Sequence, residues 1–360
     1  MGLAEKKESI TVRPDRAVLT AMPKIEVHRH LEGTYPIESL FRMAMKNGLD
    51  VPENLAEFKK AFQFPKNHGP DFLLFLSKFK KFWYKDLDDV SSIAFDSVRA
   101  MGEEHLHYIE LRFNPLHFTE LTDLDPKDVT TAIISSSDAA AAEINLNIRY
   151  LITFNRSFQT SQEMIDIYKM LHEVDLSRVV GIDLAGDEIN FPPEHFTEFF
   201  DFVKKDGRYG IDIHAGEVTD SKNMWVAIER LHADRIGHGV AAIDDEKIQG
   251  VLRDKEIFLA QCITSNHQTG AWKDEVTHPM KRLTENGVPV TIASDDPTIQ
   301  DSLLVDDYEK AANNFDWSVD DLIQSNLKSV NACFLSDADK KDLTRSYIQA
   351  VDEFKTEFGF

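Results

Sequence analysis

Residues 25–33 read Ile-Glu-Val-His-Arg-His-Leu-Glu-Gly, a short β-rich run with two histidines near its end. Seven further short runs of this kind follow along the chain. The eight expected strands are Ile25–His30, Tyr108–Arg112, Ile148–Thr153, Val179–Asp183, Ile211–His214, Arg235–Gly237, Ile257–Gln261 and Val288–Ile292. The segments between them mostly have helical patterns. Alternating strands and helices favour a parallel sheet, and eight such units predict a closed (β/α)8 barrel of the TIM type.

Several connecting segments carry clear helix signals. Pro126–Ile144 is rich in alanine, and Asp125 before Pro126 suits an N-cap followed by a first-turn proline. Pro193–Lys205 and Met224–His232 also have helical spacing. The stretch after Asp301 predicts two or three closing helices.

The first connection is exceptionally long, about 75 residues from Leu31 to His107. It contains three helical patterns, Pro36–Asn47, Leu55–Phe62 and the aromatic-rich Asp71–Trp83. An insertion after a barrel strand lies on the C-terminal face, where active sites occur, so this one predicts a lid. We therefore expect residues 1–360 to form one domain with a helical cap at about 34–105.

Composition limits the classes of partner. Lys and Arg total 40 against 62 Asp and Glu, a formal charge of −22, which disfavours nucleic acid and anionic membranes. The only cysteines, Cys262 and Cys333, indicate a reducing compartment. Neither a run of about 18 apolar residues nor a signal peptide in the polar Met1–Ser9 is found. We expect a soluble cytoplasmic protein that acts on a small molecule.

Four strand ends carry groups that can bind a metal or move protons. His28 and His30 are separated by one residue on a strand, so both side chains point to the same side. The other three segments are Ile213-His214-Ala215-Gly216-Glu217, Arg235-Ile236-Gly237-His238-Gly239 and Ile292-Ala293-Ser294-Asp295-Asp296-Pro297. Each has an ordinary structural explanation, such as packing, a carboxylate at a helix N-terminus, or a solvated turn.

Their convergence favours a functional interpretation. The ends of parallel barrel strands meet at one rim, so His28, His30, His214 and Asp295 would form a His3Asp set suited to zinc. A catalytic zinc keeps a position open for water and lowers the pKa of that water from about 15.7 towards about 7. The side chains of Glu217, His238 and Asp296 are of the kinds that shuttle protons and orient a substrate.

The motifs resemble those of the adenosine deaminase family, from about Pro23 to the C-terminal helices. Besides the four segments above, the resemblance includes residues 108–115, Tyr-Ile-Glu-Leu-Arg-Phe-Asn-Pro, and residues 181–188, Gly-Ile-Asp-Leu-Ala-Gly-Asp-Glu. Thr269-Gly270-Ala271-Trp272-Lys273 adds to it. The resemblance implies hydrolytic deamination of adenosine and 2′-deoxyadenosine, in purine metabolism, with one Zn²⁺ per chain.

The resemblance also implies residue roles. His28, His30, His214 and Asp295 would bind zinc, and His30 would also border the substrate. Glu217 would protonate purine N1, while His238 would orient the attacking hydroxide and stabilise the charged intermediate. Asp296 would help hold that hydroxide and bond N7, and the Gly186 backbone would bond N3. The zinc ligands of the base deaminases with His-x-Glu and Cys-x-x-Cys motifs are absent.

Glu32 departs from the family pattern, because adenosine-specific members commonly carry aspartate there to contact the ribose. Glutamate at this position is common in adenine deaminases and in deaminases of 5′-modified adenosines such as aminodeoxyfutalosine, which are the alternative activities. Residues 184–188 and 269–272 resemble the nucleoside enzymes instead. Phe72, Phe75, Phe79 and Trp83 lie where the family has an apolar lid, although simple helix packing would also explain them.

Two other classes compete. A binuclear metallohydrolase would need a bridging ligand, often a modified lysine at the end of strand four, but Asp183-Leu184-Ala185-Gly186 contains no lysine. A barrel kept only for binding would have lost a ligand or the catalytic carboxylate, yet all are present. One metal ion per chain with deaminase activity is therefore expected. The sequence leaves the oligomeric state open.

Overall fold

The structure, a computed structural model, describes residues 14–359, so the expectation for Met1–Ser9 lies outside the described residues. Eight strands form one sheet in the order β1 to β8, and every neighbouring pair is parallel. The strands are β1 (Lys24–His30), β2 (Leu106–Phe113), β3 (Asn147–Asn155), β4 (Val179–Ala185), β5 (Gly210–Ala215), β6 (Arg235–His238), β7 (Phe258–Gln261) and β8 (Val290–Ile292).

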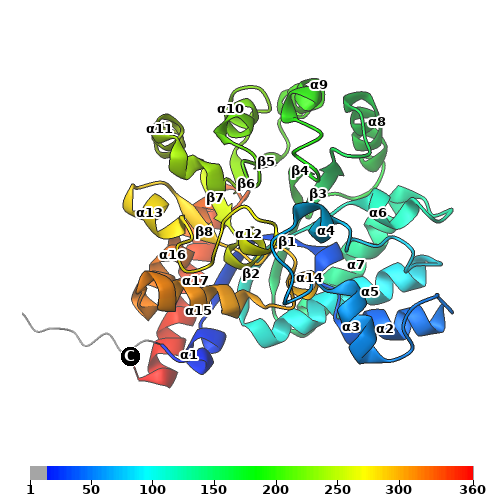
Figure 1. The fold of residues 1–360 in the computed structure, drawn as a ribbon, viewed down its shortest axis with the longest axis horizontal. Coiled ribbons are helices and arrows are strands. Elements are labelled where there is room, and N and C mark those ends of the chain that lie inside the picture. The colour runs from blue at the N-terminus through cyan, green and yellow to red at the C-terminus, as the bar shows by residue number, and fades with distance from the viewer. Residues whose placement is uncertain (1–13, 360) are drawn as a thin grey trace, which may run out of the picture.

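Asp295, just beyond β8, closes the sheet into a barrel. Its backbone N–H donates to the His28 carbonyl at 2.9 Å, and its carbonyl accepts from the His30 N–H at 3.0 Å. A parallel bridge joins Arg29 to Asp295. The fold is thus the expected TIM barrel, with all eight predicted strands confirmed to within a few residues (Figure 1).

Helices surround the barrel (Figure 1). They are α1 (Arg16–Ala21), α2 (Ile37–Lys46), α3 (Leu55–Phe62), α4 (Phe72–Leu76), α5 (Leu87–Ala100), α6 (Pro115–Thr119), α7 (Pro126–Glu143), α8 (Ser161–Leu171), α9 (Thr197–Asp206), α10 (Ser221–Glu229), α11 (Glu246–Asp254), α12 (Ile263–Gln268), α13 (Met280–Glu285), α14 (Pro297–Gln300), α15 (Leu304–Phe315), α16 (Val319–Ala332) and α17 (Asp337–Phe358). Within residues 14–359, none is long and apolar enough to cross a membrane.

Most helix predictions are confirmed, and their caps explain the boundaries. Asp125 caps α7 by accepting from the Lys127 N–H at 2.8 Å, as Asp-Pro predicts. The helix predicted over Met224–His232 begins three residues earlier, at Ser221, because Asp220 is the N-cap of α10. His232 has a left-handed φ of 58°, which lies outside that helix. The closing helices are three, α15 to α17.

The prediction of a helix over Asp71–Trp83 was wrong beyond Leu76. Only Phe72–Leu76 is helical, and the chain then turns through a lysine-rich stretch. The aromatic rings beyond it pack on different partners. The ring centroid of Phe79 lies 6.2 Å from that of Phe75, whereas the ring centroid of Phe82 lies 6.3 Å from that of Phe62.

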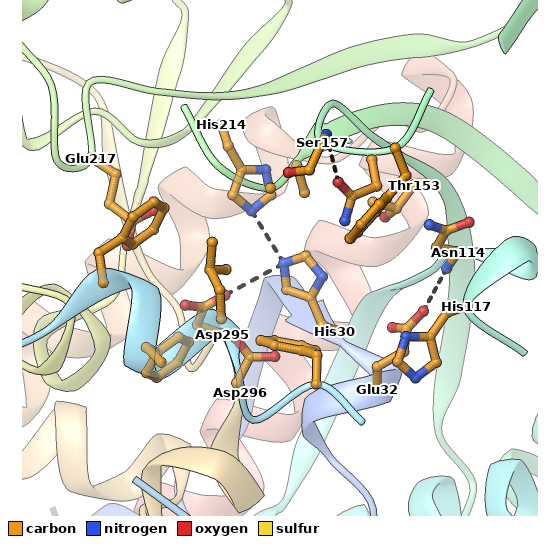
Figure 2. A pocket seen from close by; sticks show the side chains of 18 of the residues that line it. His30, Glu32, Asn114, His117, Thr153, Ser157, His214, Glu217, Asp295 and Asp296 are labelled. Atoms are coloured by element: carbon orange, nitrogen blue, oxygen red, sulfur yellow. Dashed lines mark hydrogen bonds and ion pairs between the residues drawn. The ribbon is translucent and has the colours of Figure 1, made fainter. Parts of the chain in front are cut away.

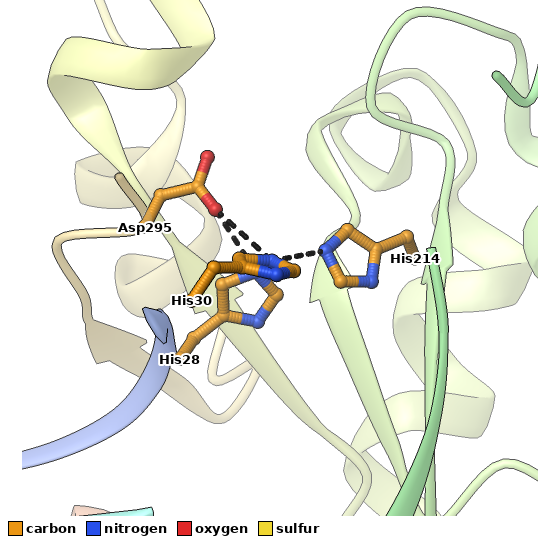
Figure 3. Close-up of side chains that lie close together, drawn as sticks. All are labelled: His28, His30, His214 and Asp295. Atoms are coloured by element: carbon orange, nitrogen blue, oxygen red, sulfur yellow. Dashed lines mark hydrogen bonds and ion pairs between the residues drawn. The ribbon is translucent and has the colours of Figure 1, made fainter. Parts of the chain in front are cut away.

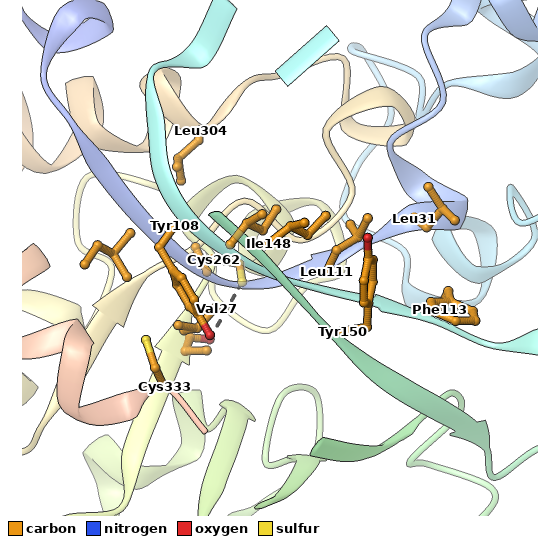
Figure 4. Packing of buried hydrophobic residues seen from close by; sticks show 14 of the residues in the cluster. Val27, Leu31, Tyr108, Leu111, Phe113, Ile148, Tyr150, Cys262, Leu304 and Cys333 are labelled. Carbon is orange, nitrogen blue, oxygen red and sulfur yellow. Dashed lines mark hydrogen bonds between the residues drawn. The ribbon is translucent and has the colours of Figure 1, made fainter. Parts of the chain in front are cut away.

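The barrel has an apolar outer face and a charged interior. On β1, the alternating residues Ile25 and Val27 are buried in the hydrophobic core. Figure 4 shows part of this core, including Val27. Inside, Arg112 pairs with Asp212 at 2.8 Å, and Arg235 pairs with the same carboxylate at 2.9 Å. These three side chains are fully buried, and pairing offsets the cost of burying their charges. The paired charges form the floor beneath the site.

Candidate active site

Four side chains converge at the C-terminal end of the barrel. They are His28 and His30 from β1, His214 from β5, and Asp295 after β8, and their ligand atoms all lie within 4.8 Å of one another (Figure 3). His30 Nε2 lies 3.1 Å from His214 Nε2, and Asp295 Oδ1 lies 3.5 Å from Nε2 of each β1 histidine. The structure therefore brings together the full predicted His3Asp set.

Local backbone geometry holds this group in place. The alternation of β1 directs His28 and His30 to the same side. Asp295 adopts a left-handed φ of 65°, an uncommon conformation stabilised here by its backbone bonds to β1. Gly237 on β6 leaves room for the imidazole, because a Cβ there would lie 2.6 Å from His28 Cε1.

The donor set fits a metal ion. His28 is completely buried, yet both of its ring nitrogens lack a hydrogen-bond partner. Burial lowers the pKa of His28 well below its usual value and that of His30 to about 3, so both rings are neutral and offer lone pairs. A cation among the four groups would satisfy these lone pairs and the Asp295 carboxylate.

A second group of possible ligands, His28, His238 and Cys262, shares a histidine with the first. Burial raises the pKa of the Cys262 thiol well above its usual value, and only a thiolate is a good metal ligand. The His238 Nδ1 is already paired with Asn266 at 3.0 Å. Among the described residues, the His3Asp set is therefore the better metal site.

Asp183 on β4 orients one ligand, a contact that the sequence reasoning missed. Its Oδ1 lies 2.9 Å from His214 Nδ1, and its Oδ2 accepts from Thr153 Oγ1 at 2.9 Å. Burial alone would raise the pKa of Asp183, but the His214 and Arg112 charges outweigh burial and lower it. A carboxylate fixed on Nδ1 leaves Nε2 of His214 free to bind a metal. The signal in the sequence was an aspartate within an otherwise apolar strand.

Glu217, His238 and Asp296 border the same space, as predicted. The Glu217 Oε2 lies 3.6 Å from His238 Nε2. Burial, with Asp295 and Glu188 nearby, raises the pKa of Glu217 well above its usual value, so this carboxyl group can carry a proton at neutral pH. The buried Asp296 Oδ1 lacks a partner, and a Cβ at Gly33 would collide with it.

These groups line one end of a cavity of about 180 Å³ (Figure 2). At the other end, Glu32 accepts a hydrogen bond from the Asn114 N–H at 2.6 Å, and burial raises the pKa of Glu32 to about 7. Gly186, with φ at 103°, also lines the cavity, and a Cβ there would meet Asn155 Oδ1 at 2.6 Å. The cavity thus extends well beyond the metal-binding group.

The aromatic residues of the insertion divide between two roles. Phe72, Phe75 and Phe79 line the cavity, which fits the lid expectation. Trp83 instead packs in the core, with its ring 4.8 Å from that of Phe62. Simple packing therefore explains Trp83, whereas Phe75 and Phe79 both line the cavity and pack in a small cluster with Phe64.

His117 on α6 is a second site residue that the sequence reasoning missed. It lines the cavity, is buried, and has an Nε2 without a hydrogen-bond partner. Lys81 also lines the cavity but is paired with Glu120 and lies 3.8 Å over the Phe158 ring. A lone histidine after a proline gave no pattern from which this position could be found.

Comparison with known proteins places these features in a family. Residues 23–351 match the family model described as Adenosine deaminase. An adenosine deaminase from Vibrio cholerae is 31% identical over 330 residues, which cover 91% of this chain and 97% of that protein. One from Pseudoalteromonas translucida is 32% identical over 329 residues, covering 89% and 96% respectively.

Solved structures share the fold. A zinc-bound amidohydrolase from Burkholderia ambifaria has a TM-score of 0.87 and 22% identity, over 99% of this chain and 97% of that one. An adenine deaminase from Arthrobacter aurescens has a TM-score of 0.83 and 21% identity, over 92% and 99%. At these identities the likeness concerns the fold alone.

Proposed function

The chain belongs to the adenosine deaminase family of hydrolases, and from this membership we propose that it hydrolyses adenosine to inosine and ammonia. We extend the proposal to 2′-deoxyadenosine and to a role in purine metabolism. The observation that carries it is the convergence of the His3Asp group with Glu217 at one end of a single cavity.

We propose zinc as the metal, one ion per chain, held by His28, His30, His214 and Asp295. Three imidazoles and one carboxylate are ligands that zinc prefers. When bound, zinc supplies Lewis acidity that makes water a nucleophile near neutral pH. A binuclear site is disfavoured because β4 ends in Asp183-Leu184-Ala185, with no lysine to bridge two metals.

The chain's own groups then account for the proton transfers. The protonated Glu217 gives its proton to purine N1 while water adds at C6. One proton of that water returns to Glu217 and the other passes to the 6-amino group, the C6–N bond breaks, and ammonia leaves a 6-oxopurine. His238 orients the attacking oxygen and stabilises the charge that develops. Asp296 helps to hold that oxygen and bonds N7, and the Gly186 backbone bonds N3.

The far end of the cavity supports a nucleoside. Glu32, Asn114 and His117 lie beyond the space that a purine beside Glu217 would fill, and Glu32 and His117 offer acceptors for sugar hydroxyl groups. His30, two residues before Glu32 in the sequence, also lines the cavity and would border the same sugar. A 5′-phosphate at this end would find no unpaired lysine or arginine among the lining residues, since Lys81 is paired with Glu120, so we expect AMP to be a poor substrate.

A panel of substrates followed at the adenine chromophore tests this proposal. Adenosine and 2′-deoxyadenosine should have the highest kcat/KM, above adenine, AMP and 5′-substituted adenosines. Free adenine would leave the buried polar groups at the sugar end unpaired, which costs affinity. If adenine or a 5′-substituted adenosine has a much higher kcat/KM than adenosine, the proposed substrate is wrong.

Replacing Glu32 by aspartate should change substrate preference and spare the metal. Shortening this side chain by one methylene gives the sugar more room, whereas adenine does not reach it. We expect the kcat/KM ratio of adenosine to adenine to rise by about 10-fold, the scale of one methylene in a pocket. Glu32→Gln, which keeps the length, serves as the matched control. An unchanged ratio with Asp would show that Glu32 does not face the sugar.

A further inference from the structure

His238 lies at the end of a chain of hydrogen bonds that begins at a backbone group. The Met280 N–H lies 3.3 Å from His278 Nδ1, and His278 Nε2 lies 3.1 Å from Asn266 Oδ1. The amide nitrogen of Asn266 lies 3.0 Å from His238 Nδ1. Asn266 therefore bridges His278 and His238.

The donor and the acceptor of every hydrogen bond in this series follow from the first bond. A backbone N–H can only donate, so Nδ1 of His278 accepts, and the proton of this neutral ring lies on Nε2. The His278 Nε2–H then donates to Asn266 Oδ1, and the Asn266 Nδ2–H donates onward to His238 Nδ1. An imidazole nitrogen that accepts carries no proton, so the proton of a neutral His238 lies on Nε2.

Burial protects this series of hydrogen bonds from competition by solvent. His238, Asn266 and His278 are 1%, 0% and 2% exposed, so these side chains are shielded from bulk water except where His238 faces the cavity. Burial lowers the pKa of His278 to about 3, so this ring is neutral. The backbone N–H of Trp272 donates to the Asn266 carbonyl at 2.8 Å and helps to fix the position of this residue.

We propose that Asn266 and His278 are positioning residues that fix the tautomer of His238, so that it directs an Nε2–H toward the reacting atoms. The nitrogen concerned faces the cavity, 3.6 Å from Glu217 Oε2. His238 is therefore a hydrogen-bond donor that stabilises negative charge on the attacking oxygen, and it is not the base that removes a proton from water. This inference rests on the proposed deamination for its catalytic consequence, but the tautomer itself is independent of the substrate.

The isosteric change Asn266→Asp reverses the final bond. Aspartate still accepts from His278 Nε2–H, but its second oxygen needs a donor, which draws the His238 proton to Nδ1 and leaves a lone pair on Nε2. We expect kcat to fall by about 10²- to 10⁴-fold, as when a catalytic histidine is held in its wrong tautomer. KM and zinc content should stay close to those of the parent protein.

Asn326→Asp is the matched control, since Asn326, 1% exposed, is also buried but bonds Tyr308 and Ile25 far from the cavity. It should keep the parent kcat. A second pair addresses misfolding of the first variant: His278→Gln retains a donor toward Asn266 and should keep most activity, whereas His278→Leu should not. Equal kcat values for this pair would contradict the proposal.

The tautomer can be observed directly in the zinc-loaded protein with ¹⁵N-labelled histidine. Long-range ¹H–¹⁵N spectra should show His238 Nδ1 as the unprotonated nitrogen and Nε2 as the protonated one, exchanged in Asn266→Asp. A proton on Nδ1 in the parent protein would overturn the inference. Failure of the proposed function would instead appear as a parent protein that binds zinc, shows this tautomer and does not deaminate adenosine.

Discussion

Glu217→Gln is expected to bind zinc like the parent protein and to deaminate adenosine more slowly by about 10²- to 10⁴-fold, the usual contribution of a general acid. Glutamine has the size of glutamate but no acidic proton. In the structure, this carboxyl group is buried beside Asp295 and Glu188, which raises its pKa and keeps a proton on it. Because the change removes the proton and little else, the loss should appear in kcat more than in KM.

The measurement is steady-state deamination together with zinc content per chain. Glu163→Gln is the control, since Glu163 caps α8 at the surface through the Thr160 backbone and makes no contact with the cavity. That variant should keep the parent kcat. Turnover near the parent value in Glu217→Gln would show that another group protonates N1.

The barrel itself could be predicted because its signals are local. Each strand is a short β-rich run, and each of the metal-binding residues stands at or near the end of one, so eight strand ends meeting at a single rim were enough to bring His28 and His214 together. The wrong helix over Asp71–Trp83 shows the limit of this approach. Its aromatic spacing suits a helix, but the rings pack on separate neighbours that only the folded chain provides.

The missed site residues have a different origin. Asp183 and Asn266 each act through a partner remote in the sequence, whereas His117 lines the cavity from α6, and sequence reasoning gave none of the three a role. Asp183 gains its function only when the pairing of β4 with β5 brings it to His214 Nδ1. Asn266 matters because of the bond direction imposed from Met280 through His278. Such roles depend on which atom donates, and the one-dimensional pattern does not contain that information.

His214→Ala is expected to lose the bound metal and, with it, all measurable deamination. In the proposed site the imidazole is one of four ligands, and it would join β5 to a metal otherwise held only by β1 and Asp295. Removing it also leaves Asp183 without its orienting contact. The fold should persist, because Asp183 keeps Arg112 at 3.1 Å and Thr153 at 2.9 Å, so its buried charge remains paired.

Zinc content and thermal unfolding separate loss of metal from loss of fold. A ligand that binds only the native state raises its stability, so added zinc should raise the Tm of the chelator-treated parent protein but not that of His214→Ala. The matched control is His172→Ala, because His172 bonds Tyr168 and Tyr209 and takes no part in the His3Asp group. That control should retain zinc and activity. Stoichiometric zinc in His214→Ala would exclude this imidazole as a necessary ligand, and the metal would then have to be held by β1 and Asp295 alone.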